Sequence, residues 1–211
     1  AADIDGTGAE ATAAALPEAV AVAVDVSDPA SVAAFADAAF AAWGTVDVLV
    51  NNAGVFQGGL MWERSAADWD WVFGVNVFGI VHAVRAFVPR MIAQGTDGHI
   101  VNTASVAAFA AGAASSPYVV SKCAALSLSE CLALDLGVVG SKIGVSVLTP
   151  SAFDTGIAGT ARVRPERFGT DETIDAKMTN EGLAAMTASG LPPSEVAAPV
   201  LAAIRSGEFL V

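Results

Sequence analysis

The 211-residue chain contains few basic residues and no long uninterrupted apolar run. Its 10 Lys and Arg stand against 22 Asp and Glu, giving a formal net charge of −12, and no basic cluster is present to neutralise a phosphate backbone. No apolar run reaches the roughly 18 residues needed to span a bilayer, and no basic segment precedes an apolar one as in a signal peptide. We therefore expect a cytoplasmic protein with neither a nucleic-acid nor a membrane partner.

Cysteine and histidine are also scarce. Cys123 and Cys131 lie on one predicted helix, roughly 12 Å apart along its axis, which is too far for a disulfide. We expect both to be small core residues in a reducing compartment. His82 and His99 have no Cys or acidic residue at metal-ligand spacing, so no metal site is expected.

Hydrophobic residues make up 54% of the chain and recur in alternating segments. Strands are expected at 19–24, 46–50, 98–105 and 143–150, with helices over 8–16, 27–43, 65–95, 117–136 and 193–206. This order predicts an α/β fold, a Rossmann-like doubly wound parallel sheet with helices on both faces. Residues 156–190 lack strong periodicity beside a strand end, so we expect a substrate lid there.

The segment 102–122 carries reactive side chains at a defined spacing. Pro117 can open a helix, which places Tyr118, the only tyrosine, and Lys122 one turn apart on one face. A nearby ammonium lowers the pKa of a phenol, so Tyr118 is a candidate general acid/base. Ser105, at the end of the preceding strand, can reach the same substrate oxygen. Since this Tyr and Lys spacing also occurs on ordinary amphipathic helices, other motifs must support the assignment.

Further candidate residues follow strand ends, where ligands of open α/β sheets bind. Asp3, with Asp5 as second choice, can accept hydrogen bonds from an adenosine ribose and would repel a 2′-phosphate. The small residues of the run 51–54, Asn-Asn-Ala-Gly, let a ligand approach the backbone closely. Asn76 stands within an apolar helix, where a buried amide must be hydrogen-bonded, either as structural support or as an anchor for ordered water.

Taken together, these motifs resemble those of the short-chain dehydrogenase/reductase family, in its shorter single-domain branch. The resemblance covers nearly the whole chain and rests on 51–54, 75–79, Ser105, 118–122 and 150–155, in family order. It implies the catalytic tetrad Asn76, Ser105, Tyr118 and Lys122. Tyr118 would exchange the proton and Ser105 would polarise the substrate oxygen. Lys122 would lower the Tyr118 pKa and hold the nicotinamide ribose, while Asn76 would anchor a water in the proton relay.

The resemblance also implies a nicotinamide dinucleotide cofactor. The family's cofactor contacts map onto Asp3, Asp25, Val26, Asn52, Ala53, Gly54, Tyr118, Lys122, Pro150 and Thr155. Asp3 matches the acid that marks NAD preference, and Ile4 offers no basic side chain to a 2′-phosphate, so NAD is expected rather than NADP. The resemblance further implies a homotetramer with contacts through the helices at 65–95 and 117–136.

The implied function is that of an NAD-dependent oxidoreductase that transfers a hydride between the nicotinamide and a secondary alcohol or ketone. Val106, Phe109 and Phe153 are expected to line a pocket for a largely apolar substrate. One alternative is a non-catalytic nucleotide-binding or scaffold protein on the same fold, against which the intact tetrad argues. Another is an epimerase or dehydratase of the family's longer branch, against which the run 51–54 argues.

Two features depart from the family pattern. The usual Pro-Gly after the sixth strand is Pro150-Ser151, which adds a Cβ near the nicotinamide. The glycine-rich turn is absent together with the first strand and its helix, so the sheet would lack its central strand, between 20–24 and 46–50. We therefore expect residues 1–211 to form a single Rossmann-type domain, incomplete at its N-terminus, from a longer molecule. An intact mass near 21.2 kDa would contradict this expectation.

Overall fold

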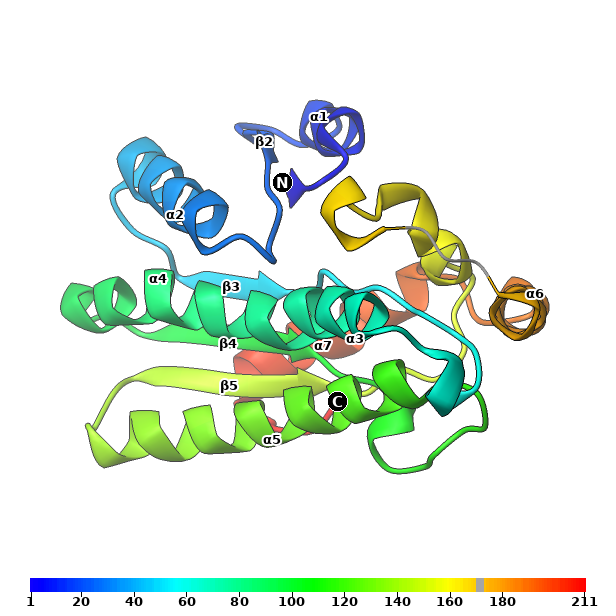
Figure 1. Ribbon diagram of the computed structural model, residues 1–211. Coiled ribbons are helices and arrows are strands. Elements are labelled where there is room, and N and C mark those ends of the chain that lie inside the picture. Colours follow the sequence, from blue (N-terminus) through cyan, green and yellow to red (C-terminus); the bar gives the residue numbers. More distant parts are fainter. Residues whose placement is uncertain (170–172) are drawn as a thin grey trace.

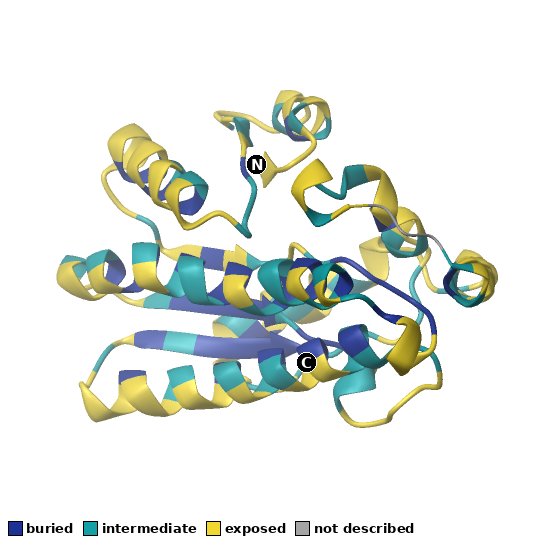
Figure 2. Ribbon diagram, in the orientation of Figure 1, coloured by how far each residue is buried: buried dark blue, intermediate teal, exposed yellow. Residues whose placement is uncertain are grey.

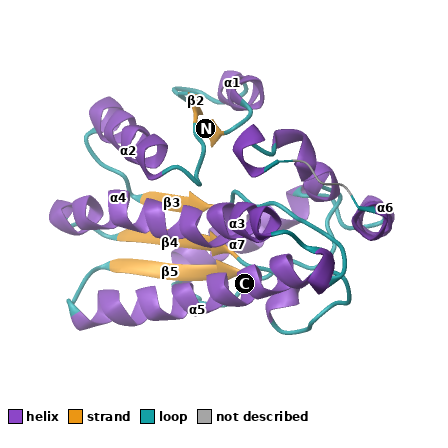
Figure 3. Ribbon diagram, in the orientation of Figure 1, coloured by secondary structure: helices purple, strands orange, loops and turns teal. Residues whose placement is uncertain are grey.

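The computed structural model describes residues 1–169 and 173–211, in which helices alternate with parallel strands (Figures 1 and 3). The strands are β1 (Ala2–Asp3), β2 (Val22–Ala23), β3 (Val48–Asn51), β4 (Gly98–Thr103) and β5 (Ile143–Leu148). The α-helices are α1 (Gly6–Ala14), α2 (Pro29–Trp43), α3 (Ala66–Phe73), α4 (Gly79–Gln94), α5 (Ser116–Val138), α6 (Ile174–Ala188) and α7 (Ser194–Ser206). The predicted α/β class with parallel strands and Rossmann-like architecture is confirmed.

The strands form two separate sheets. In one, β3, β4 and β5 pair in parallel, and the C-terminal end extends the sheet through hydrogen bonds of Val147 with Phe209 and Val211. In the other, β1 pairs only with β2. Val48 and Val50 of β3 are about half exposed, at 45% and 51%. Among the described residues, no strand joins the two sheets, as expected for a sheet that lacks its central strand.

The main core lies between the larger sheet and its covering helices. Helix α2 begins cleanly because the side chain of its N-cap residue, Asp28, accepts a hydrogen bond from Ala30 N, and it ends at Gly44, whose φ of +76° favours glycine. α2 packs against α4, and the ring centroids of Phe35 and Phe87 lie 5.4 Å apart in this contact. Figure 2 shows β4 and β5 as buried strands, whereas α1 is mostly exposed. The core therefore supports the carboxyl ends of β3, β4 and β5.

The predicted helix over 65–95 forms, but it is not uniform. Ser65 and Asp68 form a capping box at the start of α3, and the five residues Gly74–Phe78 form a π-helical turn between α3 and α4. Of the described helices, the combined stretch Ala66–Gln94 is the one long and apolar enough to cross a membrane, and half of its most apolar window is buried within the protein. A core helix has the same properties.

Two expectations for the surface were wrong. Residues 174–188 were expected to be irregular, but they form α6, after short 3₁₀ turns at Gly156–Val163 and Glu166–Phe168. Only Ala176 and Thr187 of α6 are buried, so the sequence of this helix needs no apolar face and shows little apolar periodicity. Positions 170–172 of the expected lid lie outside the described residues. Cys123 and Cys131 are free and exposed on α5, not part of the core.

Candidate active site

A cavity of about 450 Å³ lies at the carboxyl ends of β1, β2 and β3. The predicted cofactor residues that line it are Asp3, Asp25, Val26, Asn52, Ala53 and Gly54. Thr160, Arg162, Val163 and Pro165, all from the segment 156–168, also line it. Asp3 is exposed, and its carboxylate is oriented by a hydrogen bond from Asp5 N at 2.9 Å. One cavity thus brings together six predicted residues from three strand ends.

Gly54 connects this cavity with the predicted tetrad. A Cβ added at Gly54 would lie 3.4 Å from Lys122 Nζ and 3.6 Å from Asn76 Oδ1. The backbone at Gly54 therefore approaches both side chains closely. A ligand seated along the cavity wall at Gly54 would lie beside the lysine ammonium and the asparagine amide.

Asn76 is buried within the π-helical turn and is fully hydrogen-bonded. Its Oδ1 accepts from Val55 N at 2.8 Å, and its Nδ2 donates to Val55 O at 3.0 Å and to Ser121 Oγ at 2.9 Å. The side chain therefore ties the loop after β3 to α5. This satisfies the requirement that a buried amide be paired, and it fixes the wall on which Gly54 lies.

Lys122 is buried on α5, with 3% of its surface exposed. Its Nζ donates a hydrogen bond to Thr103 O at 2.8 Å, at the end of β4. Burial lowers the pKa of Lys122 to about 8, because a desolvated ammonium loses its hydration. Since that value is still above 7, the side chain remains mostly charged at neutral pH.

Tyr118 lies one turn before Lys122, and its ring centroid is 5.2 Å from that of Phe56. Burial raises the pKa of Tyr118, against a smaller opposing effect of a hydrogen bond with Ser105. The lowering of this pKa expected from the sequence is therefore wrong. The physical reason is that Lys122 Nζ is 5.6 Å from the Tyr118 ring centroid and donates instead to a backbone carbonyl.

Ser105 directly follows β4 and lies between two backbone groups. Its hydroxyl accepts a hydrogen bond from Ala107 N at 3.1 Å and donates one to Pro150 O at 3.4 Å. Pro150 follows β5, so this contact joins the ends of neighbouring strands. Asn76, Ser105, Tyr118 and Lys122 are thus brought together at one edge of the sheet by hydrogen bonds and close contacts.

The expected substrate residues are not gathered in one cavity. Val106 and Phe109 are 44% and 60% exposed. Phe153 lines a second cavity of about 470 Å³, together with Pro150 and residues from α7. The backbone explains this placement of Phe153, because the neighbouring residues Ala152 and Asp154 hydrogen-bond to Leu191. Thr155 is exposed and begins a 3₁₀ turn without lining the 450 Å³ cavity.

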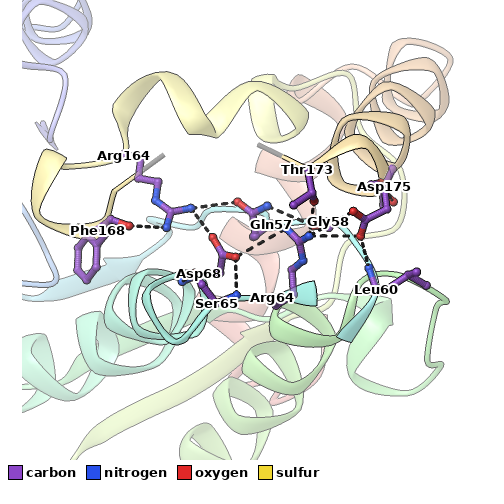
Figure 4. Close-up of polar contacts among 11 residues, drawn as sticks. Gln57, Gly58, Leu60, Arg64, Ser65, Asp68, Arg164, Phe168, Thr173 and Asp175 are labelled. Carbon is purple, nitrogen blue, oxygen red and sulfur yellow. Dashed lines mark hydrogen bonds and ion pairs between the residues drawn. The ribbon is translucent and has the colours of Figure 1, made fainter. Parts of the chain in front are cut away.

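Sequence reasoning missed a buried cluster of charged side chains beside the cavity (Figure 4). Arg164 Nη1 lies 2.7 Å from Asp68 Oδ1, and Arg64 lies between Asp68 and Asp175. A further arginine of the same segment, Arg167, pairs with Asp25 at 2.7 Å. One signal was available, since Arg162, Arg164 and Arg167 place three of the chain's ten basic residues within six positions.

The carboxylate of Asp25 is held by several partners. Its Oδ1 accepts from Ser27 N at 3.0 Å and from Ser27 Oγ at 2.6 Å, while Oδ2 accepts from Arg167. Burial alone would raise the pKa of Asp25, but the hydrogen bonds from Ser27 and Arg167 outweigh it and lower the pKa. Asp25 is therefore charged at neutral pH and bound to the segment 156–168.

The two histidines make structural contacts. His82 Nδ1 lies 2.9 Å from Val26 O, and His99 Nε2 lies 2.8 Å from Ser146 Oγ. Within residues 1–169 and 173–211, no group of three or more His, Cys, Asp or Glu is placed to hold a metal ion. The His82 imidazole thus contacts a backbone carbonyl, and the His99 imidazole joins β4 to β5.

Comparison with known proteins identifies the family. Residues 1–165 match the family model described as short chain dehydrogenase. A C alpha-dehydrogenase of Sphingobium sp. is 32% identical over 191 residues, which is 90% of this chain and 62% of the relative. A 1-deoxy-11-beta-hydroxypentalenate dehydrogenase of Streptomyces avermitilis is 40% identical over 158 residues, which is 74% of this chain and 57% of the relative. The chain thus spans less than two thirds of the length of these relatives.

A solved structure agrees closely with this fold. The crystal structure of a short chain dehydrogenase/reductase from Burkholderia phymatum in complex with NAD has a TM-score of 0.96 and 43% sequence identity. The match covers 100% of this chain and 77% of that chain. The protein belongs to the short-chain dehydrogenase/reductase family.

Proposed function

We propose that the protein is an NAD-dependent oxidoreductase that transfers a hydride between nicotinamide and a secondary alcohol or ketone. The observation that carries this proposal is the contact at Gly54, where the 450 Å³ cavity meets Lys122 and Asn76. A cavity that is lined by Asp3 and Asp25 and that lies beside Lys122 at Gly54 suits a dinucleotide. Such a ligand must present its adenosine and its reactive ring to different groups.

The residues present fit the two ends of the cofactor. The Asp3 carboxylate can accept hydrogen bonds from the adenosine ribose and would repel a 2′-phosphate, which favours NAD over NADP. At Gly54 the absence of a Cβ leaves room for close approach beside Lys122, which can hold the nicotinamide ribose. When bound, the cofactor supplies the hydride chemistry. The other predicted contacts, Pro150 and Thr155, would adjoin the nicotinamide.

Within this site Tyr118 acts as the general acid/base. In the reductive direction its protonated phenol donates the proton to the substrate oxygen, and its raised pKa keeps the proton in place beforehand. Ser105 donates a hydrogen bond to the same oxygen. Lys122 can stabilise the tyrosinate that forms once its ammonium leaves Thr103 O. Because both Nδ2 hydrogens of Asn76 are already donated to Val55 O and Ser121 Oγ, the water that returns the proton would bind Asn76 at Oδ1 or at its backbone.

The remaining expectations are part of the same proposal. Residues 1–211 act as a single domain, the segment 156–190 serves as its lid, and the substrate is a small, largely apolar alcohol or ketone that contacts Val106, Phe109 and Phe153. We also propose a cytoplasmic homotetramer joined through α4 and α5. Exposed apolar side chains on these helices and the preceding π-helical turn support such contacts, including Phe78 at 51%, Leu134 at 71% and Val138 at 86%.

The test compares the wild-type protein with Tyr118→Phe in two assays. Fluorescence titration with NADH and NADPH should show tighter binding of NADH to both proteins. Turnover of a panel of secondary alcohols and ketones should fall about 100- to 10,000-fold in the variant, because the proton donor is lost. Wild-type protein that binds NADH and turns over no member of the panel would instead support a non-catalytic nucleotide-binding or scaffold protein. Equal turnover by both proteins would contradict the role of Tyr118.

A further inference from the structure

The segment 156–168 forms one wall of the cavity, and three of its side chains attach it to the rest of the protein. Thr160 is buried, and its hydroxyl accepts a hydrogen bond from Phe56 N at 3.0 Å. Arg164 pairs with Asp68, and Arg167 pairs with Asp25. These attachments differ in exposure to water, and that difference determines which of them can open.

Arg164 is a buried attachment (Figure 4). Its side chain is 5% exposed and that of Asp68 is 2% exposed. Besides Asp68, the guanidinium donates to Gln57 Oε1 at 3.2 Å and to Phe168 O at 2.7 Å. Separating this pair would leave a charge buried without its partner, which is strongly unfavourable. Because Phe168 O is bound to Arg164, the backbone turn at 166–168 is held in place as well.

Arg167 is attached at the surface. Its Nη2 lies 2.7 Å from Asp25 Oδ2 and 2.7 Å from Ser27 Oγ, yet its side chain is 51% exposed. An exposed ion pair has a small net free energy and is screened by salt. With the backbone of the turn fixed, the long Arg167 side chain is the part that can rotate into solvent.

The Arg167–Asp25 pair connects two segments that each contribute residues to the cavity lining. Asp25 and Val26 line the cavity from the end of β2, while Val163 and Pro165 line it from the segment that carries Arg167. The pair therefore links two segments that line the cavity, although Arg167 is not itself among the lining residues. A ligand that passes between these segments beside Asp25 would meet this pair.

We infer that Arg167 is a positioning residue that controls the exchange of the dinucleotide, since its ion pair with Asp25 links two segments that line the cavity and opens by rotation of one side chain. This inference rests on the proposed function. The closed pair opposes entry and release equally. Its removal should therefore accelerate both rates by the same factor and leave the dissociation constant unchanged. A residue that only contacts the ligand would change the dissociation constant instead.

The experiment measures NADH association and dissociation by stopped-flow fluorescence for wild type, Arg167→Ala and a matched control, Arg90→Ala. Arg90 also forms an exposed ion pair, with Asp37 at 2.8 Å, and neither residue lines the cavity. We expect both rates to rise about 2- to 5-fold in Arg167→Ala, consistent with the strength of exposed pairs, and to stay at the wild-type value in Arg90→Ala. Added salt should accelerate release from the wild type and not from Arg167→Ala.

Two results would overturn the inference while the proposed function stands. One is unchanged rates in Arg167→Ala, and the other is faster dissociation with unchanged association, which would make Arg167 a ligand contact. Wild-type protein that binds neither NADH nor NADPH would overturn the proposed function itself and this inference with it. Thermal unfolding of both variants serves as a check, because a general loss of structure would lower the Tm of Arg167→Ala well below that of Arg90→Ala.

Discussion

Asp68 and Asp25 each bind an arginine of the same short segment, and in both pairs the nearest nitrogen and oxygen are 2.7 Å apart. The surroundings differ, since Arg164 and Asp68 are 5% and 2% exposed, whereas Arg167 and Asp25 are 51% and 20% exposed. Two pairs with the same distance are therefore expected to differ in their effect on stability. When one partner of the buried pair is lost, the other charge remains buried without a partner. When one partner of the exposed pair is lost, water takes its place.

Asp68 also lies beside a second arginine, Arg64. Arg64 Nη1 lies 3.7 Å from Asp68 Oδ2, and Arg64 Nη2 lies 3.2 Å from Asp175 Oδ2 and hydrogen-bonds to Thr173. Among the described residues, Arg64 Nε and Nη1 and Arg164 Nε are buried without a hydrogen-bond partner. The cluster therefore depends heavily on the Asp68 carboxylate, which joins α3, the segment 156–168 and, through Arg64, the start of α6 (Figure 4).

The largest expected effect comes from Asp68→Ala. The substitution leaves two buried guanidinium groups without their shared carboxylate, so we expect the free energy of unfolding to fall by about 3 to 5 kcal/mol. Chemical denaturation measures it, and Asp37→Ala is the control, because removal of an exposed partner should change the free energy by less than about 1 kcal/mol. Equal losses in the two variants would refute the distinction between buried and exposed pairs.

Lys122 extends the comparison to a buried cation whose hydrogen bond is to a carbonyl. Its pKa of about 8 in the folded protein is below the value of 10.5 for an unfolded chain, so the unfolded state binds more protons between these pH values. The stability of the wild type relative to Lys122→Met should therefore rise with pH across this window, by about 3 kcal/mol in total. Denaturation of both proteins at pH 7 to 10 measures the difference, and a constant difference would contradict the predicted ionisation.

The smallest effect is expected for Asp25→Asn. Its exposed pair should contribute less than about 1 kcal/mol to the free energy of unfolding, and 1 M salt should remove most of that contribution. Because the folded pKa of Asp25 is lowered from 3.8, the contribution is present at neutral pH and is lost as the pH falls below about 4. Denaturation with and without salt tests this. A loss as large as that of Asp68→Ala would show that exposure does not distinguish the two pairs.

Local sequence patterns were sufficient to predict much of the fold and the grouping of Asn76, Tyr118 and Lys122 near the strand ends. Alternating apolar segments predicted the parallel strands, and Asp28, Pro29 and Gly44 marked the ends of α2 because capping depends on neighbouring residues. Tyr118 and Lys122 were placed correctly on α5 since their spacing matches one helical turn. The burial and full pairing of Asn76 followed from a polar residue within an apolar helix.

Contacts between distant parts of the chain could not be predicted in this way. Arg164 and Asp68 are 96 positions apart, and neither hydrophobic periodicity nor capping signals encode such a pair. The raised pKa of Tyr118 has the same origin, because the phenol is buried by side chains such as Phe56 from another part of the chain. Helix α6 was missed because so few of its residues are buried, and the π-helical turn because one wider turn leaves the apolar pattern nearly unchanged.

The π-helical turn at Gly74–Phe78 makes the length of this stretch as important as its composition. A π-turn accommodates one residue more than an α-turn, so deletion of one residue here could give a regular helix. That deletion would leave α3 and α4 nearly aligned, because the wider turn takes up the extra residue, whereas a deletion on either side of the turn would rotate α4 relative to α3 by about 100°. After such a rotation, Asn76 could no longer face both Val55 and Ser121 while α4 keeps its contact with α2. Substitutions at the exposed position Phe78 should be accepted more readily than a change in the number of residues on either side of the turn.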